Sequence, residues 1–165
     1  MKKLFLFGNN DITTVGWRAL SNVLRDPNCK LVELDLHDAG IDDESADVLG
    51  SALASLSVST LNLSSNRSIS SAGWQTFMNQ LSRAPIEKLN LHGNNIDSNG
   101  LAALAGIDTL KSLDLSNTKI DDTASAALAN LCDNMESLDI HTNRSITPSG
   151  WQSFFNSLQT RATRL

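Results

Sequence analysis

The chain repeats one arrangement of apolar and polar positions six times. At the centre of each copy two apolar residues flank a single variable residue, and the copies are Leu4-Phe5-Leu6, Leu34-Asp35-Leu36, Leu61-Asn62-Leu63, Leu89-Asn90-Leu91, Leu113-Asp114-Leu115 and Leu138-Asp139-Ile140. Side chains alternate between the two faces of a strand, so each copy predicts a short strand with two buried residues and one outward residue. A further apolar residue stands three positions before each pair, and the repeats therefore start near residues 1, 31, 58, 86, 110 and 135.

The second half of every repeat carries the signals of a helix. An isoleucine follows each strand, and the next residue is one that favours a helix N-cap: Thr13, Asp42, Ser70, Asp97, Asp121 and Thr147. Pro148 then occupies a first helical position, where its missing N–H costs nothing. A small residue four positions after the isoleucine and a large apolar residue eight positions after it predict a helix packed closely on the strand layer.

The combined pattern L-x-x-L-x-L-x-x-N-x-I resembles the leucine-rich-repeat family over the whole chain. Repeats this long, with a helical second half, are most similar to the ribonuclease-inhibitor-like subfamily. The resemblance implies an α/β solenoid of six repeats in a single domain, residues 1–165. A parallel sheet would line the concave side of this horseshoe, and helices would cover the convex side.

The asparagine of the pattern is replaced in two repeats, by Ala39 and Thr118, and is present in the others as Asn9, Asn66, Asn94 and Asn143. In the resembled family this side chain hydrogen-bonds backbone groups of the bend and forms a buried ladder. We therefore expect a weaker ladder in the second and fifth repeats. Because a buried asparagine cannot carry a glycan, the sequons that begin at Asn66 and Asn143 are discounted as glycosylation sites.

Three repeats carry one extra loop residue together with a Gly-Trp pair at the start of the helix, namely Gly16-Trp17, Gly73-Trp74 and Gly150-Trp151. Tryptophan is enriched at the centres of protein interfaces, which makes these side chains candidate anchors. However, each indole has the same position in its repeat and follows a small residue. This regularity predicts packing in the core.

Charge and composition exclude several classes of function. The net charge is −5, the pI is near 5.0, and the 13 basic residues are scattered, whereas binding to a nucleic-acid backbone requires clustered Lys and Arg. No apolar run is long enough for a membrane span or a signal peptide. Cys29 and Cys132 stand about four repeats apart, roughly 19 Å at the strand spacing, which excludes a disulfide between them. We therefore expect a cytoplasmic protein.

The outward positions of the strands form columns on the concave face. The column after each pair reads Phe7, His37, Ser64, His92, Ser116 and His141, so it contains all three histidines. Neighbouring histidines are expected roughly 10 Å apart, twice the strand spacing, which is too far for one metal ion to bridge. No nucleophile elbow, phosphate-binding loop, dinucleotide turn or zinc signature is present. We expect no enzymatic activity, no metal and no cofactor.

The expected function is binding of a partner protein on the concave face. Solenoids present a long curved surface, and in the resembled family this surface typically binds proteins. Its balance of acidic and amide side chains suggests a partner with a basic patch. The residues expected to make the contacts are Glu33, Asp35, His37, Asn62, Lys88, Asn90, His92, Asp114, Asp139 and His141.

Two other classes of function stay open. One is a regulatory part of a larger protein, resembling the repeat domains of innate-immune receptors or GTPase-activating proteins, with Arg67 and Arg144 as its candidate arginines. The other is a structural or self-assembling repeat without a dedicated ligand.

The two ends of the chain bear on this choice. Met1 and Leu165 occupy the same position of the repeat, and neither end shows the polar capping unit that a solenoid ordinarily needs. Phe5 and Phe7 make the outward side of the first strand apolar. We expect either a module of a longer or engineered array, or a short protein whose open ends associate.

Overall fold

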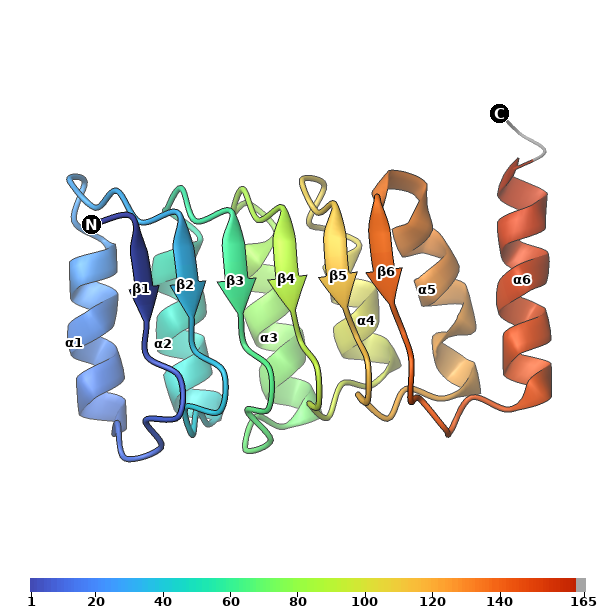
Figure 1. The fold of residues 1–165 in the computed structure, drawn as a ribbon, viewed down its shortest axis with the longest axis horizontal. Helices are drawn as coiled ribbons and strands as arrows, with labels where there is room; N and C mark the ends of the chain where they lie inside the picture. Colours follow the sequence, from blue (N-terminus) through green and yellow to red (C-terminus); the bar gives the residue numbers. More distant parts are fainter. Residues whose placement is uncertain (163–165) are drawn as a thin grey trace.

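The computed structural model describes residues 1–162, and these form one parallel sheet covered by helices (Figure 1). The seventh-repeat position expected at Leu165 lies outside the described residues. Each strand pairs in parallel with the next one in the chain, so that the central leucines lie side by side. The strands are β1 (Lys3–Phe5), β2 (Glu33–Asp35), β3 (Thr60–Asn62), β4 (Lys88–Asn90), β5 (Ser112–Asp114) and β6 (Ser137–Asp139).

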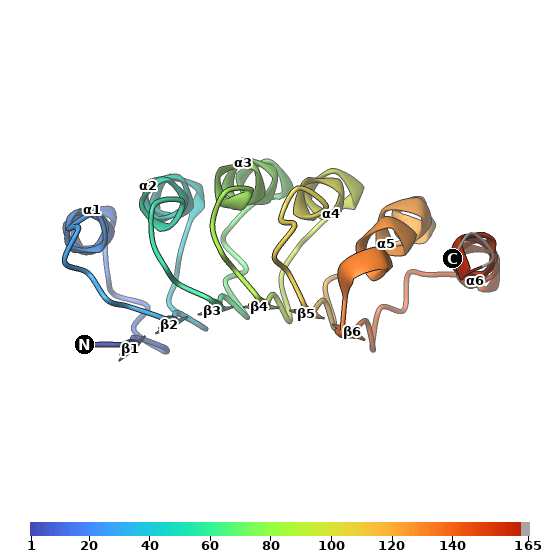
Figure 2. The same ribbon diagram turned by 90° about the horizontal axis from the view of Figure 1, so that it is seen from above.

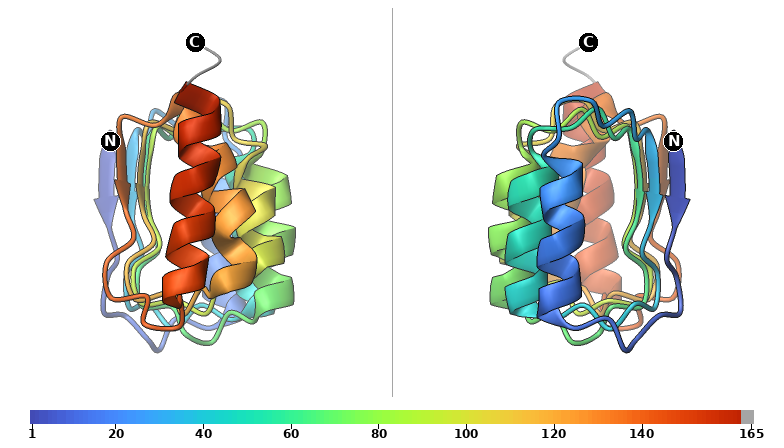
Figure 3. Two further views of the ribbon diagram at one scale, coloured as in Figure 1. Left: turned by 90° about the vertical axis from the view of Figure 1, so that its right-hand side faces the viewer. Right: turned by 90° about the vertical axis from the view of Figure 1, so that its left-hand side faces the viewer.

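One helix follows each strand, and all of them lie on the same side of the sheet (Figure 2). Seen from either end, the strands form one layer and the helices the other (Figure 3). The helices are α1 (Thr14–Leu24), α2 (Asp43–Leu53), α3 (Ser71–Leu81), α4 (Ser98–Leu104), α5 (Ser125–Leu131) and α6 (Pro148–Ala162), with the 3₁₀ turns η1 (Asp122–Ala124) and η2 (Cys132–Asn134) on either side of α5.

The sheet is curved, and its strands line the concave side (Figure 2). Packed helices need about 8–10 Å between their axes, whereas paired strands need only about 4.8 Å. Because every unit contributes one strand and one helix, the helix layer becomes wider than the strand layer and bends the stack. This arrangement confirms the α/β solenoid expected from the sequence.

The apolar pair of each strand lies in a core shared by all repeats. Leu34 and Leu36 of the second repeat are fully buried, as are the corresponding leucines of β3, β4 and β5. Leu4 and Leu138, from the two outer strands, are only half-buried. Each outer strand has a neighbour on one side only, so a repeat completes the burial of the repeats beside it.

The tryptophans pack in the core where a following repeat covers them. Trp17 and Trp74 are fully buried, which confirms the expected core packing for these two. Trp151 is half-buried and stacks on Phe155, with 5.9 Å between the ring centroids. Its neighbour is thus an aromatic ring of its own helix α6.

The asparagine ladder ties the bends of the third, fourth and sixth repeats to the one before, through Asn66, Asn94 and Asn143. Asn9 was expected in this buried ladder but is exposed and donates to carbonyls of its own repeat. The Nδ2 atom of Asn66 donates to the carbonyls of Leu63 and Leu36, and its Oδ1 atom accepts the amides of Ala39 and Ile41. The bend that contains Ala39 is therefore held by the asparagine of the following repeat. Asn66 is buried and its amide group is fully engaged, which agrees with discounting its sequon.

The fifth repeat is held in the same way. The Thr118 hydroxyl donates to the Leu115 carbonyl at 2.7 Å, and the buried Asn143 donates to the same carbonyl and accepts the Thr118 amide. The two repeats expected to weaken the ladder thus have their bends secured from the next repeat.

Most helices begin at the expected cap residue. Asp42, Ser70 and Asp97 each accept the backbone N–H of the residue three positions on. Thr13 and Asp121 also stand at N-cap positions, as expected, but their bonds differ. The Thr13 side chain makes no capping hydrogen bond. Asp121 accepts the amide of the residue only two positions on, so the fifth repeat begins with the tighter turn η1 before α5.

Candidate functional site

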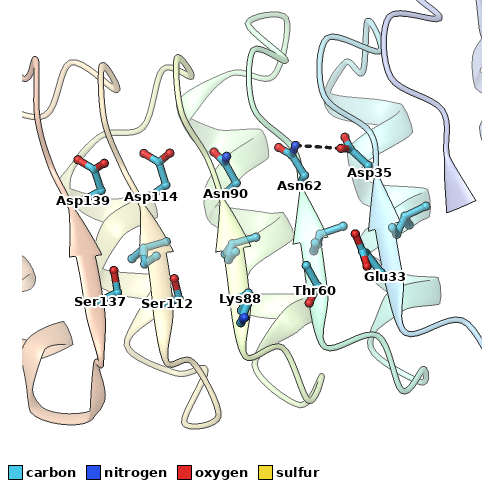
Figure 4. A pocket seen from close by; sticks show the side chains of 14 residues that line it. Glu33, Asp35, Thr60, Asn62, Lys88, Asn90, Ser112, Asp114, Ser137 and Asp139 are labelled. Carbon is cyan, nitrogen blue, oxygen red and sulfur yellow. Dashed lines mark hydrogen bonds between the residues drawn. The ribbon is translucent and has the colours of Figure 1, made fainter. Parts of the chain in front are cut away.

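A groove of about 410 Å³ crosses the concave face from β2 to β6 (Figure 4). Two rows of polar side chains line it and run across the strands. The acidic–amide row consists of Asp35, Asn62, Asn90, Asp114 and Asp139, and the mixed row consists of Glu33, Thr60, Lys88, Ser112 and Ser137. The histidine row lies two residues further along the chain and consists of His37, Ser64, His92, Ser116 and His141.

Every member of the acidic–amide row holds the backbone where its strand ends. Its Oδ1 atom accepts the N–H of the residue two positions on, over donor–acceptor distances of 2.9–3.1 Å. Aspartate and asparagine serve alike, because both supply a carbonyl-type oxygen on the same short side chain. The sequence-based expectation of a purely outward contact role misses this function. The restriction of the position to Asp or Asn in five repeats is the signal that indicates it.

The backbone bond leaves the second carboxylate oxygen of each aspartate available to other donors. In Asp35 this oxygen accepts from Nδ2 of Asn62 at 3.2 Å (Figure 4). Within the described part of the chain, no hydrogen bond reaches Oδ2 of Asp114 or Asp139. These two residues are partners in the β5–β6 register, so their side chains are neighbours on strands about 5 Å apart. This end of the groove is therefore suited to cationic donors.

The histidine rings lie closer together than the strand spacing suggests. The ring centroids of His92 and His141 are 6.4 Å apart, so the expected separation of roughly 10 Å is wrong for the rings. Strand spacing sets the backbone distance, whereas side chains on the inside of a curved sheet lean toward one another. Among the described residues, no group of three or more His, Cys, Asp or Glu side chains could hold a metal ion.

Each histidine is fixed through Nδ1. This atom lies 2.9 Å from Asp35 in His37, 2.6 Å from Asp139 in His141, and 2.7 Å from the Ser116 hydroxyl in His92. Hydrogen bonds from the backbone N–H of His141, which has the larger effect, and from the His141 ring hold the pKa of the Asp139 carboxyl below its ordinary value of 3.8. Asp139 therefore stays ionised to a lower pH than an unperturbed aspartate.

Asp114, Ser116 and His92 form a hydrogen-bonded chain that superficially resembles a hydrolytic site. The Ser116 hydroxyl donates to Asp114 Oδ1 at 2.5 Å and also lies next to His92 Nδ1. An activated serine needs an accessible oxygen and a base that takes its proton. Ser116 is fully buried, and its proton is directed at the carboxylate. The chain therefore orients His92 and does not create a nucleophile.

A sequence profile of the leucine-rich repeat matches residues 28–50, 84–105 and 108–129. The matched segments coincide with strand–helix units whose leucines fill the shared core of the parallel sheet. The chain has the fold of a leucine-rich-repeat solenoid. No curated protein sequence matches it.

Solved structures with the same fold agree with this assignment. The solenoid is similar to a tropomodulin C-terminal domain of Caenorhabditis elegans, with a TM-score of 0.63, 14% identity and coverage of 90% of this chain and 94% of that one. A leiomodin-1 structure described as actin-binding site 2 gives a TM-score of 0.60 at 16% identity, covering 99% and 85%. The yeast Rad7–Elc1 complex gives 0.65 at 20% identity, covering 86% of this chain but only 37% of the other. At these identities the likeness establishes the fold alone.

The solenoid brings most of the expected contact residues together. Glu33, Asp35, Asn62, Lys88, Asn90, Asp114 and Asp139 line the groove, and the three histidines stand in the adjacent row. Glu33 also pairs with Lys3 at 2.5 Å, which offsets its charge. Arg67 and Arg144 are exposed in loops and do not line the groove. The groove also includes neutral side chains that charge-based reasoning missed, namely Thr60, Ser112 and Ser137.

Residues 1–162 contain no helix with the length and apolar character needed to cross a bilayer.

Proposed function

We propose that this leucine-rich-repeat solenoid binds a partner protein on its concave face, with Asp114 and Asp139 as the principal contacts. The observation that carries the proposal is the pair of adjacent carboxylates whose orientation is fixed by their own backbone. Each keeps one oxygen that no described residue engages. A contact surface that is already ordered loses little conformational entropy on binding.

The chemistry of the groove favours a basic patch on the partner. An arginine guanidinium presents parallel N–H donors that match a carboxylate, and two neighbouring carboxylates can receive two such groups. Asn62 and Asn90 extend the row with amide groups that can both donate and accept. The chain's net charge of −5 would attract a basic partner over distance. The names of two similar structures, a leiomodin actin-binding site and the Rad7–Elc1 complex, support a protein as the class of partner.

The proposal is tested with substitutions that change charge but keep the fold. Asp114→Asn combined with Asp139→Asn removes two charges, and Asn62 and Asn90 show that asparagine can make the backbone bond at this position. The matched control is Asp11→Asn combined with Asp108→Asn, which makes the same charge change in exposed loops outside the groove.

Wild type and both double variants are immobilised and used to capture proteins from a lysate, and captured proteins are identified and titrated individually. We expect at least one partner to bind the groove variant about tenfold or more weakly and the control normally, which corresponds to one lost charge-assisted contact. Identical affinities of all captured partners for the three proteins contradict the proposal.

The full-length helices α1 to α3, of 11 residues each, support a place in the ribonuclease-inhibitor-like subfamily. No disulfide joins Cys29 and Cys132 within the described residues, which supports a reducing compartment such as the cytoplasm. We infer a binding role without catalysis, supported by the burial of Ser116.

A further inference from the structure

Two junctions between repeats are closed by the same pair of hydrogen bonds. The Asp43 carboxylate accepts the backbone N–H of Ser70 at 2.7 Å and the Ser70 hydroxyl at 2.6 Å. Asp122 accepts the N–H and the hydroxyl of Thr147 at the same two distances. We call this arrangement the repeat clasp. It joins the first helical residue of one repeat to the cap residue just before the helix of the next repeat.

The clasp connects two distinct kinds of repeat. We call the repeats that supply the carboxylate the donating repeats; these are the second and the fifth, and both carry Ile-Asp-Asp at the start of the helix. We call the repeats that supply the N–H and the hydroxyl the receiving repeats; these are the third and the sixth, and both carry the longer loop and Gly-Trp. The glycine is needed for the contact, because a Cβ atom on Gly73 or Gly150 would lie 2.1 Å from a carboxylate oxygen of the clasp. A receiving repeat therefore accepts a particular neighbour.

The first repeat is of the receiving kind but has no clasp. It has Thr13 at the cap position and Gly16-Trp17 after it. In the clasped repeats the cap hydroxyl donates to the aspartate and accepts the N–H of Gly73 or Gly150. The Thr13 hydroxyl makes no capping bond. The first helix thus has the receiving groups of a clasp without the carboxylate that would orient them.

The outer edge of β1 carries the same backbone groups that pair two strands at a junction between repeats. In β2, the amides of Val32 and Glu33 donate to the preceding strand, and the Asp35 carbonyl accepts from it. The equivalent groups of β1 are the amides of Lys2 and Lys3 and the carbonyl of Phe5. β1 is the edge strand of the sheet beside α1 (Figure 3).

Apolar surface adjoins this edge. A groove of about 250 Å³ between β1 and α1 is lined chiefly by aliphatic side chains, including Leu4, Leu20 and Leu24. Met1 also lines this groove and is 80% exposed. In the second to fifth repeats, the positions equivalent to Met1, Leu4 and Leu20 are buried, as Leu31, Leu34 and Leu49 of the second repeat illustrate.

We propose that this N-terminal face is a docking surface for a leucine-rich-repeat unit of the donating kind. Such a unit lays a parallel strand beside β1, fills the apolar groove, and places an aspartate on the N–H and hydroxyl of Thr13. A second copy of this chain stacked end to end does not fit, because its sixth repeat has Pro148 where the clasp has Asp43 or Asp122. The face therefore selects an acidic repeat over the chain's own opposite end.

The test extends the full chain before Met1 with a copy of residues 31–57, the second repeat. A matched extension carries Asp43→Ser in the copy only, since serine stands at the same position in the third and fourth repeats as Ser71 and Ser98. Both extended chains and the unextended chain are also made with Thr13→Val. Thermal unfolding is measured for all six proteins. A further variant, Asp43→Ser in the unextended chain, shows how much loss of a native clasp lowers the melting temperature.

We expect the aspartate extension to melt roughly 2–4 °C above the serine extension, and Thr13→Val to abolish this difference. In the unextended chain Thr13→Val should leave the melting temperature unchanged. The proposal is overturned if the two extensions melt together, if either melts below the unextended chain, or if the difference survives Thr13→Val. Sedimentation of the unextended chain provides a second measurement, and concentration-dependent growth would identify a second copy as the occupant. None of these results depends on the concave face.

Discussion

Trp74 offers the sharpest test of how the repeats hold together. Its side chain is fully buried and packs edge-on against Phe77, with 5.8 Å between the ring centroids. Burying an indole removes roughly 150–250 Å² from water, which stabilises the fold by about 4–6 kcal/mol. The Nε1 atom, however, has no hydrogen-bond partner among the described residues, and a buried N–H left in this way costs about 1–3 kcal/mol. Trp74→Ala should therefore lower the free energy of unfolding by about 3 kcal/mol, at the low end for such truncations.

Urea unfolding followed by far-ultraviolet circular dichroism measures this loss without relying on tryptophan fluorescence. Trp151→Ala is the matched control and should cost clearly less, because Trp151 is only half-buried. Trp74→Phe should cost less than about 1.5 kcal/mol, since it keeps an aromatic ring and removes the N–H that lacks a partner. The reasoning is refuted if Trp74→Ala and Trp151→Ala cost the same, or if Trp74→Phe costs as much as Trp74→Ala.

Two further predictions concern the ladder and the helix caps. Asn66→Ala should lower the free energy of unfolding by about 1–3 kcal/mol more than Asn94→Ala does. The reason is that Oδ1 of Asn66 accepts two buried amides, whereas Oδ1 of Asn94 has no partner in the described chain. Equal losses of stability in urea unfolding would contradict this. Hydrogen bonds from Ser45, the larger effect from its hydroxyl and the smaller from its backbone amide, hold the pKa of Asp42 below 3.8. The hydroxyl and amide of Thr123 lower the pKa of Asp121 in the same way. The stability that these carboxylates contribute is complete above about pH 4 and is lost as the pH falls through their lowered pKa values. A variant with Asp42→Asn and Asp121→Asn should therefore lose less stability than wild type in this acidic range, and parallel pH profiles would refute the assignment.

The sequence by itself determined the repeat and the contents of the core. Alternation in the Leu-x-Leu segments, a cap residue after each isoleucine, and small and large residues at fixed helical offsets are all signals within about twenty residues. They predicted the six strands, the helix after each one, and the burial of Leu36, Leu63, Trp17 and Trp74. They also placed most of the groove residues on one face, because outward positions of stacked strands must form rows.

Only the tertiary structure decided which contacts form between neighbouring repeats. Asn66 reaches back to Leu36, Asp43 clasps Ser70 27 residues later, and His92 approaches His141 across the width of β5. These contacts depend on the curvature of the sheet and on loop lengths, which set where each side chain meets the next repeat. The backbone role of the acidic–amide row was equally hidden, because a residue type that suits a solvent-facing contact also suits a turn. Local pattern fixes what each repeat is, whereas the stacking of the repeats fixes which atoms remain available to a partner.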